Sequence, residues 1–172
     1  MADLFNQCGA SFSDDRKYRY ALWRIWDNSK PLVMFIGLNP STANETDNDP
    51  TIKSVCRIAK NNGFGGVYMM NCFPLVSTNP SALDEIVYTP LHDYAVSKNN
   101  AWLNKAGKLC KEIVFAWGSF GVVIMSGRNA DLMEMFPQAK ALSINKNGSP
   151  KHPLYCKSNT QLITYNPKTF KI

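Results

Sequence analysis

The chain has 172 residues, of which 45% are hydrophobic and 19% charged, a balance that excludes intrinsic disorder. This length and composition predict one globular domain over residues 1–172, and the net charge of +6 favours polyanionic partners. Because the sequence shows no secretory signal and no apolar run of roughly 20 residues, we expect a cytoplasmic protein with no membrane partner.

The first segment with a clear pattern is "RKYRYALWRIWD", residues 16–27. Its apolar and polar residues alternate, which is typical of an edge strand, although a short helix fits as well. Four apolar runs of strand length then follow: Leu32–Ile36, Val67–Met70, Ile113–Trp117 and Ala141–Ile144. Continuous apolar runs are typical of parallel strands that are covered on both faces.

Helical patterns separate these four runs. The first begins at Asp49, a good N-cap, followed by Pro50 as the first helical residue and by Gly63 as a C-terminal stop. Two more patterns cover residues 97–110 and 127–136. Residues 72–96 carry three prolines and are expected to form a long functional loop.

The alternation of strands and helices predicts an α/β protein. The expected architecture is a three-layer α/β/α sandwich around a central, mostly parallel four-stranded sheet. Ligands of such sheets bind beyond the carboxyl ends of the strands, so the segments 37–42, 71–73, 117–119 and 145–155 should converge on one pocket. Asn39, Asn71 and His152 would be its polar groups.

Neither a metal nor a cofactor is expected. The five cysteines are scattered and form no C-x-x-C pair, so free thiols are the simplest interpretation and a zinc site is not predicted. The glycine-rich stretch "NGFGGVY" precedes a strand, which is the wrong context for a dinucleotide-binding loop.

The order of these strand-end motifs resembles the uracil-DNA glycosylase superfamily. "GLNPS" (37–41) is similar to its first motif, "VYMMN" (67–71) to its base-reading strand, and "IVFAWGS" (113–119) to its Trp-Gly strand end. "KHPLY" (151–155) matches the start of its final His-Pro motif, whose downstream Ser-Pro-Leu-Ser part is absent here. The resemblance covers roughly residues 32–156.

Nearly the full length is also similar to an uncharacterised bacterial and phage family of unknown function. Its members share an opening like residues 16–27, then "GLNPSTAN", "DNDPTI", "WG" and "HPLY". This closer resemblance brings no established substrate with it.

The superfamily resemblance implies cleavage of an N-glycosidic bond, with Asn39 and His152 as catalytic residues. Asn39 would position a water near C1′, and His152 would donate a hydrogen bond to the departing base. Asn71 would read a pyrimidine edge, while Ser41 and Thr42 could hold a phosphate. The substrate-binding residues expected on this basis are Gly37, Leu38, Pro40, Ser41, Thr42, Asn71, Phe73, Trp117, Gly118 and Pro153.

Several further residues are candidates. Asp49 or Asp47 could supply the missing carboxylate base if it faces the pocket, although Asp49 is expected first as the helix cap. Phe73, Trp117 and Tyr155 could stack on a flipped base, with Phe73 favoured because it lies near Asn71. Positive charge for a phosphate backbone could come from Lys146, Lys151 and either Arg16 or Arg19.

Three functions therefore remain open. The first is a DNA glycosylase-like hydrolase acting on a modified, deaminated or mismatched base, with DNA as its partner. The second is a hydrolase of a free nucleoside or nucleotide. The third is a non-catalytic nucleic-acid- or protein-binding module on the same fold.

Overall fold

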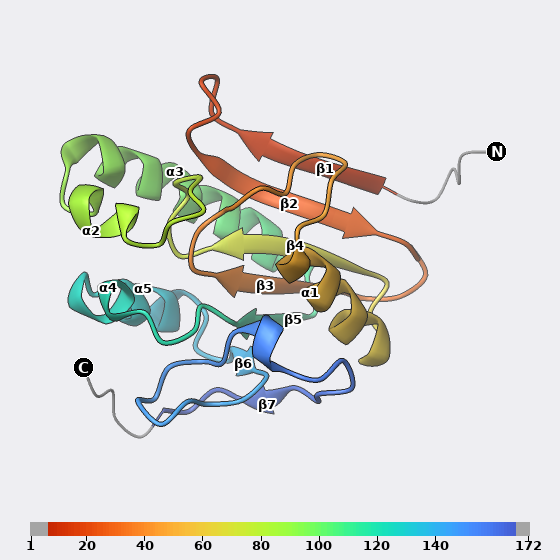
Figure 1. The fold of residues 1–172 in the computed structure, drawn as a ribbon. Helices are drawn as coiled ribbons and strands as arrows, with labels where there is room; N and C mark the ends of the chain where they lie inside the picture. The colour runs from red at the N-terminus through yellow and green to blue at the C-terminus, as the bar shows by residue number, and fades with distance from the viewer. Residues whose placement is uncertain (1–6, 168–172) are drawn as a thin grey trace.

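A mixed β-sheet forms the middle of the molecule, and helices cover both of its faces (Figure 1). The computed structural model describes residues 7–167. Within them the strand order is β1-β2-β4-β3-β5-β6-β7. The strands are β1 (Gln7–Phe12), β2 (Arg19–Ile25), β3 (Leu32–Gly37), β4 (Gly66–Asn71), β5 (Glu112–Phe115), β6 (Lys140–Ala141) and β7 (Ile163–Thr164).

Three of the four predicted apolar runs form β3, β4 and β5, whereas the fourth, Ala141–Ile144, shares only Ala141 with β6. β3 lies between β4 and β5 and pairs in parallel with both, Val33 standing opposite Val67 on one side and Glu112 on the other. β6 continues the parallel order beside β5. The prediction of an α/β protein with a parallel central sheet is confirmed at this level.

The predicted strand number is wrong, because antiparallel strands extend the sheet at both sides. β1 and β2 form a hairpin, and β2 also pairs antiparallel with β4. Segment 16–27 is therefore a strand and not a helix, but it lies inside the sheet and β1 forms the edge. At the opposite side β7 pairs antiparallel with β6. The sheet thus has seven strands in the described part of the chain and is mixed.

Helix α1 (Pro50–Asn61) begins where the sequence predicts. The Asp49 carboxylate accepts a hydrogen bond from the Ile52 backbone N–H at 2.8 Å, and Pro50 occupies the first turn. After the helix, Gly63 adopts a φ of 81°, in the left-handed region that glycine enters at little cost.

The helices of the other face are α2 (Ala82–Ile86), α3 (Pro90–Leu109), α4 (Gly121–Met125) and α5 (Arg128–Met135). α3 begins earlier than predicted, because Thr89 caps its N-terminus and Pro90 fits a first helical turn. The expected loop 72–96 is thus partly helical. Across residues 7–167, no helix combines the length and the apolar character needed to cross a membrane.

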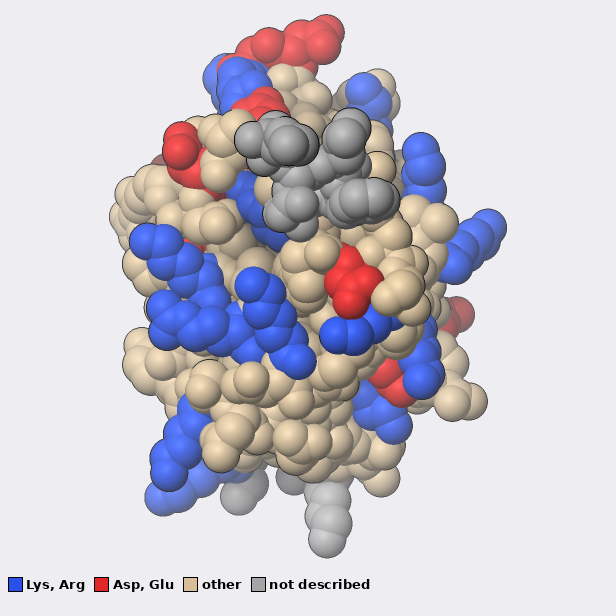
Figure 2. Space-filling model, turned by 90° about the vertical axis from the view of Figure 1, so that its right-hand side faces the viewer, with Lys and Arg blue, Asp and Glu red and all other residues tan. Residues whose placement is uncertain are grey.

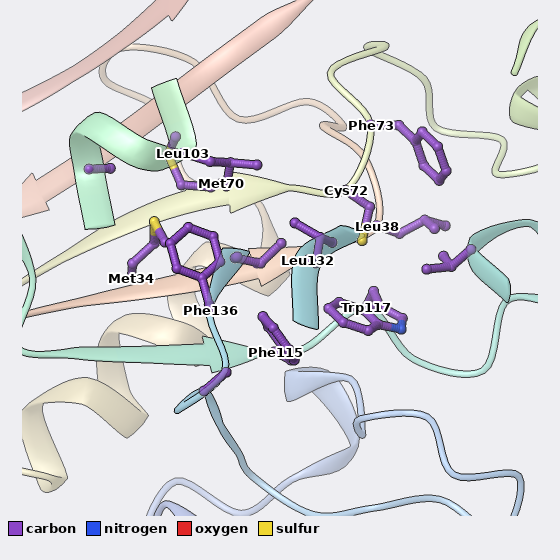
Figure 3. Packing of buried hydrophobic residues seen from close by; sticks show 14 of the residues in the cluster. Met34, Leu38, Met70, Cys72, Phe73, Leu103, Phe115, Trp117, Leu132 and Phe136 are labelled. Atoms are coloured by element: carbon purple, nitrogen blue, oxygen red, sulfur yellow. The ribbon is translucent and has the colours of Figure 1, made fainter. Parts of the chain in front are cut away.

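Two apolar layers hold the helices against the sheet. On one face Ile52, Val55 and Ile58 of α1 pack against β3, β4 and β5. On the other face Leu103 of α3 and Leu132 of α5 pack against Met34, Met70 and Phe115 (Figure 3). The molecule therefore has a helical layer on each side of its sheet.

The connections leave the sheet in opposite directions. The loop after β3 leads to α1 on one face, whereas the chain after β5 leads to α4 and α5 on the other. Since β3 and β5 are neighbours, their diverging loops leave an opening at the carboxyl ends of the strands.

Candidate functional site

A cavity of about 740 Å³ lies at these carboxyl ends. All four strand-end segments contribute to it, so the structure brings them together as the topology argument predicts. The sequence-predicted residues on its wall are Gly37, Leu38, Asn39, Ser41, Asp49, Asn71, Gly118, Lys151, His152 and Tyr155.

The remaining predicted residues lie outside the cavity wall. Phe73 and Trp117 are buried in the apolar core beside Cys72 and Leu38 (Figure 3), so the aromatic favoured for stacking is not available to a ligand. Asp47 and Thr42 are exposed, and Asp47 bonds with Asn44.

Pro40 and Pro153 are also buried off the wall, and their backbone carbonyls brace neighbouring segments. The Pro40 oxygen accepts from the Ser77 backbone N–H at 2.9 Å. The Pro153 oxygen accepts from the Ser54 hydroxyl of α1 at 3.1 Å. Both prolines therefore shape the loops that carry the site.

The side chain of Asn39 has a fixed orientation. Its amide nitrogen donates to three backbone carbonyls, those of Pro40, Leu75 and Ser77, at 3.0–3.1 Å. Carbonyl oxygens only accept hydrogen bonds, so the nitrogen must face them and the amide cannot be reversed. Asn39 Oδ1, for which the described residues offer no donor, is left facing the cavity.

Asn71 is 2% exposed and ends β4. Gly37 of the neighbouring strand makes room for it, because a Cβ at position 37 would lie 3.0 Å from Asn71 Oδ1. The Asn71 amide bonds to no other described residue, although the residue is almost fully buried on the wall. It therefore presents both a donor and an acceptor to whatever occupies the cavity.

His152 is held as the neutral tautomer that carries its proton on Nε2. Its Nδ1 accepts the Leu154 backbone N–H at 3.2 Å and caps the short helix η1 (Pro153–Tyr155). Burial lowers the pKa of His152, and the nearby Asp49 carboxylate offsets part of this effect. The Nε2–H donor is free of partners within residues 7–167 and lies on the cavity wall.

Contacts of Gly118 and Ser119, in the loop after β5, help to place His152 on the cavity wall. Gly118 has a φ of 79°, and a Cβ at that position would lie 3.4 Å from the His152 Cβ. The Gly118 backbone N–H donates to the Pro150 oxygen at 2.9 Å, and Ser119 contacts Ser149 at 3.0 Å. The loop after β5 therefore supports the loop that carries His152.

Asp49 combines a structural and a chemical position. One carboxylate oxygen caps α1, and the residue also lies on the cavity wall. Burial lowers the pKa of both Arg19 and His152, and the negative charge of Asp49 opposes this shift in each case. Of the two acidic candidates, only Asp49 lies on the wall.

Arg19, which the sequence analysis offers beside Arg16 as a source of positive charge, lies on the cavity wall, and its burial there was not predicted. Its alternation with apolar neighbours is typical of an outward-facing strand residue, yet Arg19 is 2% exposed. The sequence pattern of residues 16–27, which fits a strand or a short helix, gave no sign that the Arg19 side chain is buried. Other wall residues lie outside the four predicted segments, among them Thr51, Ser77, Thr78 and Phe120.

The cavity wall carries few charged side chains. Figure 2 views the molecule from the side where β3 and β4 begin, and Lys and Arg side chains gather on that face. The cavity lies at the opposite ends of these strands. On its wall, two cations, Arg19 and Lys151, face one anion, Asp49.

A metal ion has no evident set of ligands. No group of three or more His, Cys, Asp or Glu side chains in the described range is arranged to hold one. The polar groups of the cavity are instead amides, hydroxyls, an imidazole and single charges, which are suited to an organic ligand.

Comparison with known proteins identifies a family and no activity. Neither a curated protein nor a solved structure matches the chain. A family model described as "Protein of unknown function (DUF1643)" matches residues 19–154, which run from the start of β2 into η1 and include every residue named above on the cavity wall except Tyr155. The resemblance to an uncharacterised family is confirmed, whereas none of these comparisons links the chain to the uracil-DNA glycosylase superfamily. The protein belongs to the DUF1643 family.

Proposed function

We propose that this protein is a hydrolase that cleaves the N-glycosidic bond of a nucleotide base held in the cavity. The observation that carries the proposal is the fixed amide of Asn39. Three carbonyls bind its nitrogen, so its oxygen is preorganised to accept a hydrogen bond from a water molecule. The order of the motifs, which resembles that of uracil-DNA glycosylases, supports the same chemistry.

The other free groups of the cavity have matching roles in this reaction. Breaking the bond leaves positive charge on the sugar and negative charge on the base. His152 Nε2–H would donate to a base oxygen as charge develops there, and the Asn71 amide would bind the edge of a pyrimidine.

Asp49 supplies the proton acceptor that an asparagine lacks. The amide of Asn39 aligns water but does not take its proton at neutral pH. The Asp49 carboxylate lies on the same wall and keeps one oxygen free of the α1 cap. We therefore assign Asp49 as general base or as the anion that stabilises the oxocarbenium-like sugar.

The aromatic contact to the base would come from the cavity rim. Phe73 and Trp117 are buried in the core, but Tyr155 and Phe120 lie on the cavity wall and are 76% and 38% exposed. Base–aromatic stacking is worth about 1–3 kcal/mol, so either ring would stabilise a bound base substantially.

The form of the substrate divides the proposal into two. A base in DNA would have to be rotated out of the helix into the cavity. A free nucleotide would enter directly, and the small number of charged residues on the cavity wall, which are Arg19, Lys151 and Asp49, favours this second form. A binding module without catalysis would use the same groups but would release no base.

The test is release of a base from a substrate panel. The panel contains single- and double-stranded oligonucleotides with uracil, mismatched thymine and modified bases, together with free nucleosides and nucleotides. Oligonucleotide products are revealed by alkali at abasic sites, and free bases by chromatography. Release from any member supports the proposal, and correctly folded protein that releases none refutes it.

Variants then locate the reaction. Asn39→Ala and His152→Ala should each lower the rate about 100-fold or more. Asn104→Ala, which changes an exposed asparagine on α3, is the matched control and should leave the rate unchanged. Equal rates for all three variants would show that another site does the chemistry.

A further inference from the structure

Arg19 is a buried cation with unused hydrogen-bond donors. Its Nη1 donates to the Ala43 oxygen at 2.8 Å, but its Nε is fully buried and has no partner. Its Nη2 bonds to nothing within residues 7–167 and is not enclosed, which leaves it facing the cavity that Arg19 lines. No carboxylate of the described chain lies within 4.0 Å of this guanidinium.

A second buried arginine on the same strand shows what a purely structural role looks like. Arg24 is 5% exposed, and its three nitrogens all donate, to Asn48, Gly9, Trp23, Asn44 and Asp47. Those bonds fix the loop before α1. The Arg19 side chain makes one such bond, and its other N–H donors stay unpaired. Support of a neighbouring loop therefore does not explain why an arginine is buried at this position.

The charge of Arg19 persists at neutral pH. Burial lowers its pKa to about 10, while the Asp49 carboxylate acts in the opposite direction. A guanidinium that stays protonated in a buried wall requires a compensating anion, and the described residues place none in contact with it. A bound anion would supply that partner.

The same cavity holds the other groups that an anion needs. The hydroxyl groups of Ser41 and Thr51 are on its wall, and Lys151 adds a second cation. Thr51 lies in the first turn of α1, where backbone N–H groups have no acceptor within the helix. Donors that a strand, a loop and a helix end contribute to one cavity wall suit the several oxygens of a tetrahedral group.

We propose that Arg19 anchors a phosphate-binding subsite of this cavity, with Ser41 and Thr51 as its neutral donors, so that the ligand is a phosphorylated nucleoside. The phosphate can belong to a free nucleotide or to a nucleic-acid strand. The nucleoside part rests on the proposed function, whereas the phosphate subsite does not depend on hydrolysis.

Calorimetry on the wild-type protein tests the subsite directly. The probes are the common nucleosides, their 5′- and 3′-monophosphates, a short single-stranded oligonucleotide and inorganic phosphate. For at least one base, a monophosphate should bind about tenfold more tightly than its nucleoside, and inorganic phosphate should compete with it. Equal affinities for every such pair, or no binding by any phosphorylated probe, would overturn the proposal.

Variants assign the effect to Arg19. Arg19→Gln should remove the tenfold preference and leave the affinity for the nucleoside unchanged. Arg19→Lys should keep only part of the preference, because an ammonium cannot bind Ala43 and the phosphate as the planar fork does. Arg16, the alternative that the sequence offered for this role, lies off the cavity wall and is paired with Glu45, so Arg16→Gln removes the same charge and is the matched control. A full preference in folded Arg19→Gln would refute the assignment.

Thr51→Val provides an independent variant if Arg19→Gln does not fold. It removes one donor hydroxyl from the same wall and should weaken monophosphate binding without affecting the nucleoside. Unchanged monophosphate binding by Thr51→Val would remove α1 from the subsite and contradict the proposal as stated.

The two proposals fail in different ways. Phosphate-dependent binding without release of any base would refute the glycosidic reaction and support the subsite. Hydrolysis of nucleosides and nucleotides at equal rates, insensitive to Arg19→Gln, would refute the subsite and support the reaction. Preference for the oligonucleotide over the free monophosphate would place the phosphate in a strand, and the reverse order would make it a free nucleotide.

Discussion

Asp49 uses one carboxylate oxygen to cap α1 and leaves the other for the cavity, so a conservative change separates the two roles. Asparagine caps a helix about as well as aspartate does, so Asp49→Asn should keep the thermal stability of the protein. The rate of base release should fall about 10²–10⁴-fold because the charge is lost. Asp49→Ala should lose that activity and also about 1 kcal/mol of stability.

Rate assays and thermal unfolding of both variants check this expectation. Asp47→Asn is the matched control, because Asp47 is exposed and off the cavity wall. Full activity in Asp49→Asn would show that the carboxylate serves only as a cap.

Gly37 is predicted to determine how well the substrate binds. In Gly37→Ala the new Cβ would lie 2.7 Å from the Met69 Cε and 3.0 Å from Asn71 Oδ1. The end of the methionine can move aside, but the buried asparagine must turn away from its position. We expect KM to rise about tenfold, with a stability loss of about 1 kcal/mol.

Steady-state kinetics would measure this effect. Gly121→Ala, whose Cβ would meet only the Met125 Sδ at 3.9 Å, should leave KM unchanged. A KM for Gly37→Ala equal to that of the wild type would argue against contact between Asn71 and the substrate.

At the residue scale, sequence alone located polar groups better than aromatic ones. Asn39, Asn71 and His152 end or follow strands, and strand ends are defined by the hydrophobic pattern. Phe73 and Trp117 occupy similar positions in the chain, but their side chains turn into the core. The direction of a side chain after a strand ends depends on the loop backbone, which no periodicity encodes.

At the scale of elements, the parallel strands could be predicted because burial on both faces makes them continuously apolar. β1 and β7 could not, because β1 is a partly exposed edge strand and β7 has two exposed residues. β2 was ambiguous because two of its polar residues, Arg19 and Arg24, are buried. The start of α3 was missed because Pro90 suggests a loop until its role in a first helical turn is considered.

Side chains of α3 and α5 donate hydrogen bonds to the backbone at the end of β4, and the contribution of these bonds to stability can be tested. Asn99 Nδ2 donates to the backbone carbonyl oxygen of Asn71 at 2.9 Å, and Arg128 Nε donates to the backbone carbonyl oxygen of Cys72 at 2.8 Å. Arg128→Met would fill similar space but leave the Cys72 carbonyl with only the long contact from Asn99 Nδ2 at 3.5 Å, and it would remove the bond from Arg128 Nη2 to Asn100 Oδ1. We expect a loss of about 1–3 kcal/mol in the free energy of unfolding.

Urea denaturation of Arg128→Met measures this loss. Arg57→Met, on the exposed side of α1, is the control and should change stability by less than about 0.5 kcal/mol. An Arg128→Met variant as stable as the wild type would mean that burying the guanidinium costs as much as its interactions contribute, since its Nη1 makes no hydrogen bond and only a 3.8 Å ion pair with Asp131.

At the scale of the whole molecule, the candidate site follows from topology more than from any single motif. Residues 37 and 152 are far apart in sequence, and they meet because β3, β4 and β5 end together while their loops diverge. This convergence was predictable once the strands were assigned as parallel. The choice of Arg19 over Arg16 and its burial on the cavity wall were not, because they required knowing that an antiparallel strand lies beside β4.

The two histidines of the chain predict how the stability of the whole protein depends on pH. Burial lowers the pKa of both His92 and His152 from the ordinary value of 6.5. Unfolding exposes both rings, so the unfolded chain binds more protons than the native one as pH falls through about 6.5. The free energy of unfolding should therefore decrease below that pH, until the histidines of the folded protein are protonated as well.

Urea denaturation at about pH 7.5 and about pH 5.5 measures this decrease in a window above the titration of ordinary carboxylates. His92→Phe should make this decrease in the free energy of unfolding smaller. Neither ring nitrogen of His92 has a hydrogen-bond partner, and the ring packs 5.6 Å from that of Phe73, so phenylalanine fits the site without the proton. The variant should match the wild type at the higher pH and exceed it at the lower one. Equal stability of the wild type at both pH values, or an unchanged pH dependence in His92→Phe, would contradict the assignment of His92 as a buried neutral base.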